Sequence, residues 1–191
     1  MTDLTTPISK EQIKKLRVGD EITISGRILT ARDMAHRYLV RQKPSELIPI
    51  LKNGVIYHCG PIVRRGAAGF SFISAGPTTS IRQEPYQADL INRYHISAII
   101  GKGGMGEKTR QACVKHGVVY LNTVGGAAAC LAQTVRKVHD VFCLEEFGVP
   151  EAMWLIEVEF FPAIVTIDTT GADLHQQIQK ESAEARNKLL R

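Results

Sequence analysis

The chain has 191 residues, of which 44% are hydrophobic and 23% are charged. This length fits one domain of roughly 100–200 residues, and the composition excludes a disordered chain or a fibrous repeat. The N-terminus lacks the basic start and apolar core of a signal peptide, and the apolar stretches are only strand-sized. We therefore expect a cytoplasmic protein without a membrane-spanning segment.

The net charge is +5, from 24 Lys and Arg against 19 Asp and Glu. Nucleic-acid binders usually cluster such an excess and interleave it with aromatic side chains. Here the basic residues are scattered and aromatic residues make up 6% of the chain. A mild positive excess also suits an anionic small substrate, so composition alone leaves both kinds of partner open.

The first half of the chain is predicted to be rich in strands. Ser9 and Gln12 have capping-box spacing and precede apolar residues, which predicts a short helix that ends near Gly19. Alternation and turn residues predict the next elements: strands at 21–25, 27–30 and 55–58, a helix at 31–41, and a hairpin through 65–66 to 70–73.

The second half alternates between helices and strands. The expected helices are 84–95, 107–116 and 127–135, and the expected strands are 96–100, 118–121, 154–160 and 163–167, the last two separated by Pro162. This rhythm predicts a parallel or mixed sheet, and hence one α/β domain over residues 1–191. A terminal helix at 172–191 is expected to lie on the domain through an apolar stripe, with a partner contact as the alternative.

Four cysteines stand at positions 59, 113, 130 and 143, without any Cys-x-x-Cys pair. Their wide and unequal gaps disfavour a zinc ion or iron–sulfur cluster bound wholly by this chain. We expect them to be small buried hydrophobic residues. An iron–sulfur cluster, if one is involved, would have to be held by another chain.

The first candidate cluster is residues 30–36, Thr-Ala-Arg-Asp-Met-Ala-His, where a predicted strand ends and a helix starts. Thr30 and Asp33 have capping-box spacing, so a structural role could account for Asp33. Arg32 would lie in the first helical turn, where a cation opposes the helix dipole unless an anion is also bound there. His36 follows one turn later and can share a helix face with Arg32 and Asp33.

The second candidate cluster is residues 74–82, Ser-Ala-Gly-Pro-Thr-Thr-Ser-Ile-Arg, a predicted strand-to-helix turn. Exposed backbone N–H groups, several hydroxyls and one arginine can form a cradle for a carboxylate or phosphate. An ordinary turn with hydroxyl caps would explain Gly76 and Pro77 equally well. It would leave Arg82 unexplained.

The third candidate cluster is residues 101–106, Gly-Lys-Gly-Gly-Met-Gly, which match the G-x-G-x-x-G pattern of dinucleotide-binding folds. About 20 residues further on, where an acidic ribose ligand is expected, the sequence is Leu121-Asn-Thr. The glycines with Lys102 therefore indicate an anion site rather than a nicotinamide site. The alternative is a flexible glycine turn with a solvated lysine.

With these three clusters in this order, the chain resembles the C-terminal half of class I (iron–sulfur) fumarate hydratase. In two-subunit forms that half is a separate beta subunit, related to the beta subunit of L-tartrate dehydratase. The matching segments cover roughly residues 5 to 175: 18–20, 25–26, 30–36, 76–79 with Arg82, 101–103, 125–128, 153–159 and 161–162.

The resemblance implies a swivelling β/β/α fold with three layers, mixed sheets and flanking helices. It implies a hydro-lyase that reversibly hydrates fumarate to (S)-malate, as part of a homo- or hetero-oligomer and without nucleic acid or membrane. The implied cofactor is a [4Fe-4S] cluster held on three cysteines of a separate alpha subunit, with one iron open to substrate. This chain would bind no metal and would supply the cationic dicarboxylate site and the catalytic base.

The resemblance also assigns roles to eight positions: the catalytic residues are Thr78, Asp33 and His36, and the substrate-binding residues are Arg32, Arg82, Lys102, Gly76 and Thr79. Thr78 takes the place of the general base. A threonine hydroxyl becomes a base only where cations stabilise its alkoxide or a relay removes its proton. Asp33 and His36 would position Arg32 or pass protons.

Two alternatives remain open. Residues 103–106 and 148–150 are closer to the tartrate enzyme, whereas 121–129 is closer to the fumarases, so the same chemistry on L-tartrate is the first alternative. The second is a nucleotide- or phosphate-binding module built on Gly101–Gly106, with no chemistry of its own.

Overall fold

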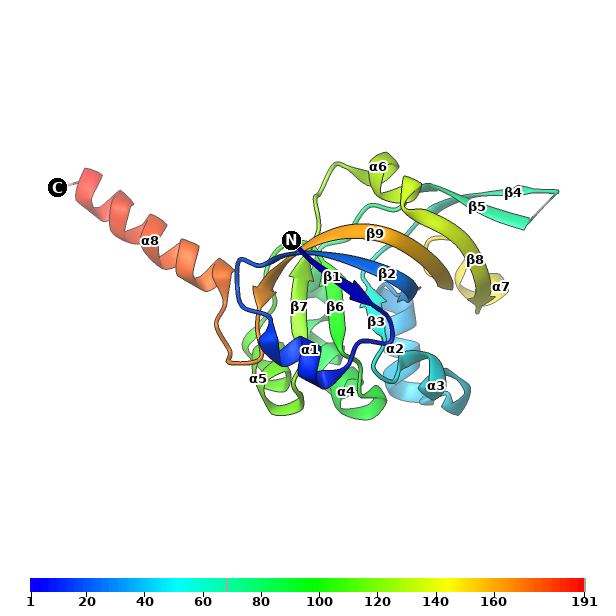
Figure 1. The fold of residues 1–191 in the computed structure, drawn as a ribbon, viewed down its shortest axis with the longest axis horizontal. Coiled ribbons are helices and arrows are strands. Elements are labelled where there is room, and N and C mark those ends of the chain that lie inside the picture. The colour runs from blue at the N-terminus through cyan, green and yellow to red at the C-terminus, as the bar shows by residue number, and fades with distance from the viewer. Residues whose placement is uncertain (68, 191) are drawn as a thin grey trace.

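A mixed sheet forms the centre of the molecule (Figure 1). The computed structural model describes residues 1–67 and 69–190. In spatial order the strands are β1 (Thr2–Thr5), β2 (Glu21–Thr30), β3 (Val55–Tyr57), β6 (Ala98–Gly101), β7 (Val119–Asn122), β9 (Met153–Ile167) and β8 (Val135–Phe142), with a separate hairpin of β4 (Ile62–Gly66) and β5 (Gly69–Ser74).

Helices connect these strands along the chain, and a last helix follows β9. They are α1 (Lys10–Lys15), α2 (Asp33–Gln42), α3 (Ile48–Leu51), α4 (Glu84–Tyr94), α5 (Glu107–His116), α6 (Ala128–Gln133), α7 (Leu144–Phe147) and α8 (Leu174–Leu189), with 3₁₀ turns η1 (Ser45–Leu47) and η2 (Ser80–Gln83). The bounds of α5 are those predicted, and Ser9 caps α1 through the predicted capping box with Gln12.

The strands from β1 to β7 in this order run parallel, and β9 runs antiparallel to β2, β7 and β8. β9 pairs with β2 from Glu21↔Ile164 to Leu29↔Leu155, although β3, β6 and β7 separate the two strands in the order of the sheet. The sheet therefore folds back on itself. The predicted α/β class, with mixed sheets and flanking helices, is confirmed.

Alternating side chains divide the core in two, because successive strand residues point to opposite faces. On β3, Tyr57 belongs to a core shared with Trp154 and Phe161 of β9. Its neighbour Ile56 belongs to a second core, shared with residues of α2, α4 and α5 such as Leu90. Figure 1 shows these helices on one side of β3, β6 and β7, and β8 and β9 on the other. The layers are β, β and α.

Three details of the predicted strands are wrong. β2 continues through Gly26 with a register shift, instead of forming separate strands at 21–25 and 27–30. β9 continues through Pro162 instead of breaking there. On one edge β9 pairs with β8 up to Val158 and with β7 from Ile164, so Pro162 lies in the gap between them and its missing N–H removes no ladder bond on that edge. β8 was not predicted, because two register shifts interrupt its alternation.

The start of α2 also differs from the expectation. Arg32 is its N-cap residue, and no side chain of its own segment caps it. Thr30 still belongs to β2, and its hydroxyl accepts a hydrogen bond from the Trp154 amide at 3.0 Å. The predicted capping box between Thr30 and Asp33 is therefore absent, because the strand ends later than the spacing suggests.

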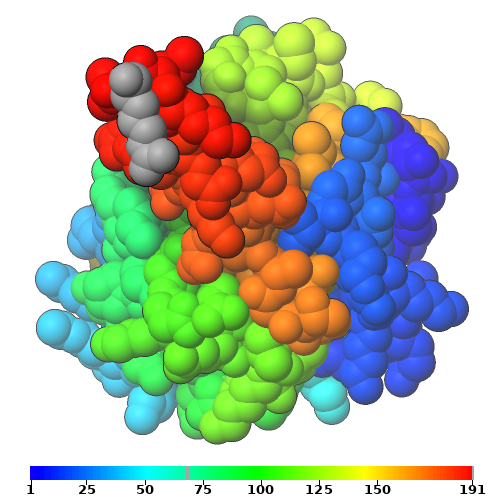
Figure 2. All heavy atoms as spheres, turned by 90° about the vertical axis from the view of Figure 1, so that its left-hand side faces the viewer, coloured from blue at the N-terminus to red at the C-terminus, as the bar shows by residue number. Residues whose placement is uncertain are grey.

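The terminal helix α8 forms as predicted but does not lie on the domain. Figure 1 shows it projecting outward, and Ile178 and Leu189 of the expected apolar stripe are 52% and 87% exposed. Only its base is anchored: His175 hydrogen-bonds Asn122 of β7 at 2.9 Å. Figure 2 views this side, with the red helix in front of the orange and green segments from which it rises. None of the helices in the described residues is long and apolar enough to span a bilayer.

Candidate active site

The three predicted clusters meet at one edge of the sheet. β2, β3 and β6 are parallel neighbours, and their carboxyl ends lead directly into Arg32, His58 and Lys102. The turn after β5 joins them through its backbone: the Thr78 amide donates to His58 O at 2.7 Å, and the Ser80 amide donates to Lys102 O at 3.1 Å. Carboxyl ends of parallel strands are where ligands bind in open α/β sheets.

Arg32 lies at the start of α2 together with a carboxylate from a distant segment. Its Nε is 3.2 Å from Glu151 Oε1, an ion pair that lacks hydrogen-bond alignment, and Glu151 Oε2 accepts the Met34 amide at 2.9 Å. The anion expected at this helix start is thus partly supplied by the chain itself. The arginine crosses Gly60, where an added Cβ would be 2.4 Å from Arg32 Cδ.

Asp33 and Arg82 form an ion pair between α2 and η2. Arg82 Nη2 is 2.8 Å from Asp33 Oδ2, and the buried Gln83 amide donates to the other Asp33 oxygen. Both charged side chains remain nearly half exposed, so the pair is accessible to a ligand. Asp33 is therefore placed to orient Arg82, whereas the sequence predicted that it would position Arg32 or pass protons.

Thr78 is half-buried in the turn that follows β5. Its hydroxyl donates to His58 O at 3.2 Å, beside the amide hydrogen bond to the same oxygen. Thr79 is exposed and pairs through its backbone with Lys102. Gly76 lies against α6, where a Cβ would be 2.9 Å from Ala128 Cβ, so this glycine is required for packing as well as for any ligand.

The glycine-rich turn after β6 is closed to phosphate. Glu84 Oε2 accepts the Gly106 amide at 2.8 Å and the Thr109 hydroxyl at 2.6 Å, and Glu84 Oε1 accepts the Thr109 amide at 3.1 Å. This carboxylate takes the place that a pyrophosphate would take at the start of α5. The geometry therefore disfavours the nucleotide-module alternative.

Lys102 precedes that turn and is half-buried. Within the described residues, no carboxylate lies within 4.0 Å of its ammonium group, whereas Arg32 and Arg82 each have one. Its stem passes Gly125, where a Cβ would be 3.5 Å from Lys102 Cδ. Lys102 is thus the cation most available to an anionic ligand.

His36 is buried behind this edge rather than in it. Its Nδ1 is 2.8 Å from Arg32 O, and its Nε2 is 3.2 Å from Gln87 Oε1. Burial lowers the pKa of His36 to about 4, although contacts with Arg32 O, Gln87 and Asp33 act in the opposite direction. Of the two roles predicted for His36, the geometry favours positioning Arg32 over passing protons to a substrate.

The cysteines do not fit an iron–sulfur cluster. Cys59 and Cys113 are buried, Cys143 is partly buried and Cys130 is exposed. Burial raises the pKa of both Cys59 and Cys113 to about 12, which favours the thiol over the thiolate that a cluster needs. No grouping of three or more potential metal ligands occurs in residues 1–67 and 69–190.

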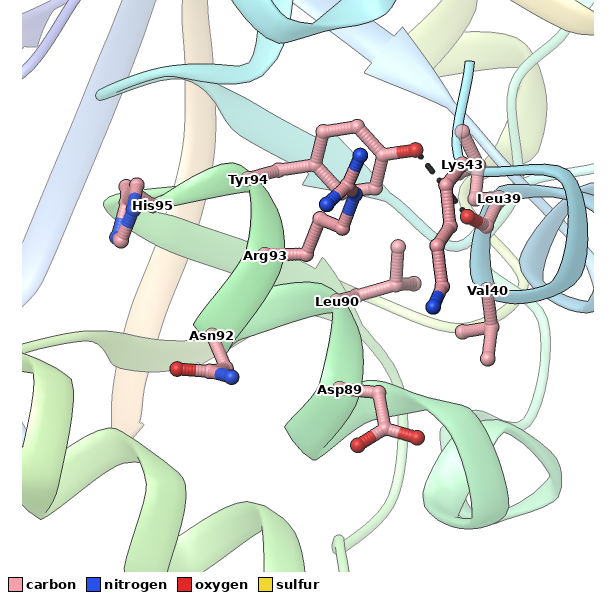
Figure 3. Close-up of a pocket in the computed structure, with 9 residues that line it drawn as sticks. All are labelled: Leu39, Val40, Lys43, Asp89, Leu90, Asn92, Arg93, Tyr94 and His95. Atoms are coloured by element: carbon pink, nitrogen blue, oxygen red, sulfur yellow. Dashed lines mark hydrogen bonds between the residues drawn. The ribbon is translucent and has the colours of Figure 1, made fainter. Parts of the chain in front are cut away.

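A cavity of about 550 Å³ lies elsewhere, between the ends of α2 and α4 (Figure 3). Tyr94 forms part of its wall and donates to Leu39 O at 3.1 Å. Lys43, Asp89 and Arg93 give it a charged lining. None of the predicted site residues lines this cavity.

Sequence reasoning missed three residues that hold the helices around the site. Glu151 and Glu84 cap helices from more than 20 positions away, and Gln87 connects two buried histidines. Glu84 and Gln87 lie one turn apart on α4, but nothing in the sequence signals their partners. Such contacts become visible only when the strand order is known.

Comparison with known proteins identifies the family. Residues 1–178 match the family described as Fumarase C-terminus. The chain belongs to the fumarase C-terminal family. The matched range ends within α8.

Relatives within the family fall into two groups. A Geobacillus stearothermophilus protein assigned as class I fumarate hydratase is 49% identical over 183 residues, which are 95% of this chain and 35% of that protein. The L(+)-tartrate dehydratase subunit beta of Escherichia coli K12 is 39% identical over 189 residues, 98% of this chain and 92% of the subunit. A Methanocaldococcus jannaschii protein assigned as the same subunit is 40% identical and covered over 95% of its length. The chain thus spans about a third of the first relative and nearly all of the other two.

Proposed function

We propose that this chain is the beta subunit of a class I fumarate hydratase, which interconverts fumarate and (S)-malate together with an alpha subunit. The observation that carries the proposal is that the segments bearing Arg32, Arg82, Lys102 and Thr78 meet at one sheet edge. Three cations from three separate segments suit a substrate with two carboxylates. The names of the fumarate hydratase and tartrate dehydratase relatives support a hydro-lyase.

Substrate binding would fall to the cations. A guanidinium group can bind a carboxylate through two parallel hydrogen bonds, and an ammonium group provides a compact charge. The Glu151 and Asp33 carboxylates each hold one arginine by part of its guanidinium, which leaves other N–H groups for a ligand. Gly76 and Thr79 would complete the cradle with backbone and hydroxyl groups.

Proton transfer would involve Thr78. In the dehydration direction, malate loses a proton from the carbon beside a carboxylate and hydroxide from the neighbouring carbon, which yields fumarate and water. Thr78 would take that proton as its alkoxide, after losing its own proton to water. Lys102 and the arginines would stabilise both the alkoxide and the charge that develops on the substrate carboxylate.

The inferred cofactor and partner are supported by the relatives that are named as a beta subunit. We infer that an alpha subunit holds a [4Fe-4S] cluster, as the resemblance to class I fumarate hydratase implies; the buried thiols Cys59 and Cys113 are not suited to be its ligands. When bound, such a cluster would act as a Lewis acid on the substrate hydroxyl. Asp33 and His36 would serve as positioning residues for Arg82 and Arg32.

Reconstitution with an iron–sulfur alpha subunit tests the proposal. The chain alone should be inactive, and the complex should convert fumarate and malate, with both tartrates as comparison substrates. Robust hydration by the chain free of iron and partner would contradict the division of labour. A complex without hydro-lyase activity on any of the four substrates would contradict the function itself.

L-tartrate dehydration is the second candidate, because relatives named as L(+)-tartrate dehydratase subunit beta match this chain over most of their own length. The tartrate dehydratase beta subunits are covered over 92% and 95% of their length, whereas the fumarate hydratase relative is about three times longer than this chain. The fumarate relative is the more similar in sequence, at 49% identity. A preference of the complex for L-tartrate over malate would establish this second candidate.

A further inference from the structure

Four polar side chains are sealed directly behind the proposed dicarboxylate site. They are His36 on α2, His58 after β3, Ser80 on η2 and Gln87 on α4, and all four are fully buried. The two imidazole rings lie edge to face with centroids 4.8 Å apart. Buried polar groups require hydrogen-bond partners, so the pattern of donors and acceptors in this cluster is fully constrained.

The His36 ring determines the orientation of the Gln87 amide. Its Nδ1 is 2.8 Å from Arg32 O, which can only accept, so Nδ1 carries the hydrogen. Burial disfavours the charged ring, and Nε2 of a neutral ring with Nδ1–H is an acceptor. The Gln87 oxygen at 3.2 Å cannot donate to it, whereas the Gln87 nitrogen is buried without a partner. Exchanging the two amide atoms gives Nε2 the donor it needs.

The same exchange satisfies His58. Its Nε2 is 3.0 Å from the same Gln87 position, and an amide NH₂ has two hydrogens, one for each ring. With Nε2 as acceptor, the His58 Nδ1 carries the hydrogen and donates to Ser80 Oγ at 2.8 Å. Ser80 Oγ also accepts the Lys102 amide at 3.2 Å. A continuous chain of hydrogen bonds thus runs from Arg32 O to the Lys102 amide.

His58 ties a further candidate residue to this chain of hydrogen bonds. Its carbonyl oxygen accepts both the amide and the hydroxyl of Thr78. The first glycine of the G-x-G-x-x-G pattern makes room for the network, since a Cβ on Gly101 would be 1.8 Å from Ser80 Oγ and 3.1 Å from His58 Nδ1. The glycine that suggests a nucleotide site is therefore required by a histidine–serine pair.

We propose that Gln87 is a positioning residue of the dicarboxylate site, which donates one hydrogen bond to His36 and one to His58 and thereby fixes Arg32, Thr78 and Lys102 relative to one another. This inference rests on the proposed function for its catalytic consequence. Apolar residues could fill the same space without requiring any partner. Apolar residues would not, however, fix the distances between the main chains of three separate segments, as this chain of hydrogen bonds does.

Nitrogen-15 NMR of the imidazole rings in the full chain tests the hydrogen-bond pattern without any assay of activity. At pH 7 both His36 and His58 should be neutral with the hydrogen on Nδ1. A hydrogen on Nε2 of either ring, or a charged His36, would overturn the proposed orientation of Gln87. Signals are assigned with single-histidine substitutions.

Gln87→Met, which keeps the length of the side chain, tests positioning against a matched control. Tyr94→Phe removes another buried α4-to-α2 hydrogen bond at the far end of the same helix, beside the cavity of Figure 3. Only Gln87→Met should shift the backbone amide signals of Thr78 and Lys102. Equal shifts in both variants, or none in either, would overturn the proposal.

In the reconstituted complex, Gln87→Met should lower kcat/KM about 10- to 100-fold, because small misplacements of catalytic groups have effects of that order. Tyr94→Phe should lower Tm about as much as Gln87→Met does, but it should leave kcat/KM unchanged. If kcat/KM fell in proportion to Tm in both variants, Gln87 would have only a structural role. If Gln87→Met does not fold, Ser80→Ala is used instead, because it is a smaller change. It too should lower kcat/KM, in contrast to Tyr94→Phe. An inactive wild-type complex would refute the proposed function, while the NMR results still decide the positioning of the three segments.

Discussion

The N-termini of α2 and α5 are capped in the same way but differ in whether the capping glutamate also pairs with a cation. Each helix follows a parallel strand, lacks a cap from its own segment, and receives a glutamate from elsewhere in the chain. At α5, Glu84 bonds two amides and a hydroxyl and has no cationic partner in the described residues. At α2, Glu151 bonds one amide and also pairs with Arg32.

This difference shows why the G-x-G-x-x-G pattern is a poor guide to a nucleotide site at the start of α5. A helix start attracts anions, but a carboxylate from the same chain removes that attraction when it occupies the amides. The site at the sheet edge relies instead on side-chain cations, whose charges the chain only partly neutralises. An anionic substrate is therefore expected at Arg32, Arg82 and Lys102 and not at the start of α5.

The largest expected effect concerns Thr78 and Lys102 at the cationic site. Thr78→Val keeps the shape and removes the hydroxyl, so kcat of the complex should fall about 10²- to 10⁴-fold with little change in KM. Lys102→Met should also lower kcat strongly. Because the two groups would act on the same charge, the double variant should be barely worse than the worse single variant. Steady-state kinetics with Tm for all three variants provide the measurement.

Near-normal kcat in Thr78→Val would remove this residue from the mechanism. Two independent, multiplicative losses would contradict shared action by Thr78 and Lys102. A lower Tm with unchanged kcat would indicate that both side chains only support the turn.

The next effect is a pH dependence of the folding stability, caused by the two buried histidines behind the cationic site, His36 and His58. Burial lowers the pKa of His36 to about 4 and that of His58 well below its usual range, with the neighbouring ring as a further cause for His58. Unfolded histidine titrates near 6.5, so between about pH 6.5 and 4 the unfolded chain binds more protons and the folded chain loses stability as pH falls. For His36 the loss amounts to about 3 kcal/mol over this window.

Denaturant unfolding at several pH values measures that slope. His36→Leu should have a lower stability at pH 7 and a shallower loss towards pH 4, because one buried titrating group is gone. A slope that equals the wild-type slope would show that His36 is charged in the folded chain or titrates as it does when unfolded.

A smaller effect separates the cationic site from other surface ion pairs. Arg82→Ala should lower kcat/KM about 10- to 100-fold, since a hydrogen bond to a charged group contributes about 1.5–3 kcal/mol. Arg136 is the control, because it forms a similarly exposed pair with Glu159, at 2.7 Å, away from the three clusters. Arg136→Ala should leave kcat/KM unchanged. Equal kinetics in both variants would exclude Arg82 from substrate binding.

Much of this arrangement can be predicted from local sequence. The capping box of α1, the bounds of α5 and the alternation of helices and strands depend on neighbouring residues, and each is confirmed. The three clusters were also found locally, because each lies where a strand ends. What brings them together is the order β2–β3–β6, which no short segment encodes.

The misses have the same physical origin. Glu151, Glu84 and Gln87 act on residues in other segments, so their sequence neighbours give no sign of their roles. Pro162 is tolerated within β9 because two different strands flank it, and the projection of α8 depends on packing that its apolar stripe does not determine. Local periodicity predicts elements well, whereas contacts between segments require the fold.

The last and smallest effect tests the two helix starts directly, by the same substitution at each. Glu84→Gln replaces one of the two acceptor oxygens at the start of α5 with an NH₂ group and should lower the free energy of unfolding by about 1–2 kcal/mol, because a weakened cap has an effect of that size. It should leave kcat/KM of the complex unchanged. Inorganic phosphate should bind the variant only as weakly as a surface site, with a Kd of about 10 mM or higher. Glu151→Gln keeps one acceptor for the Met34 amide and removes the charge that orients Arg32.

We therefore expect Glu151→Gln to lower the stability less than Glu84→Gln and to lower the activity more. Its kcat/KM should fall about tenfold, which corresponds to roughly 1.4 kcal/mol of transition-state stabilisation, because Arg32 is no longer held in place. Chemical denaturation and steady-state kinetics of the two variants give the comparison. If Glu84→Gln lowered kcat/KM as much as Glu151→Gln, the start of α5 would belong to the site after all. If neither did, Arg32 would be held by Gly60 and the helix start alone, and its ion pair would be incidental to catalysis.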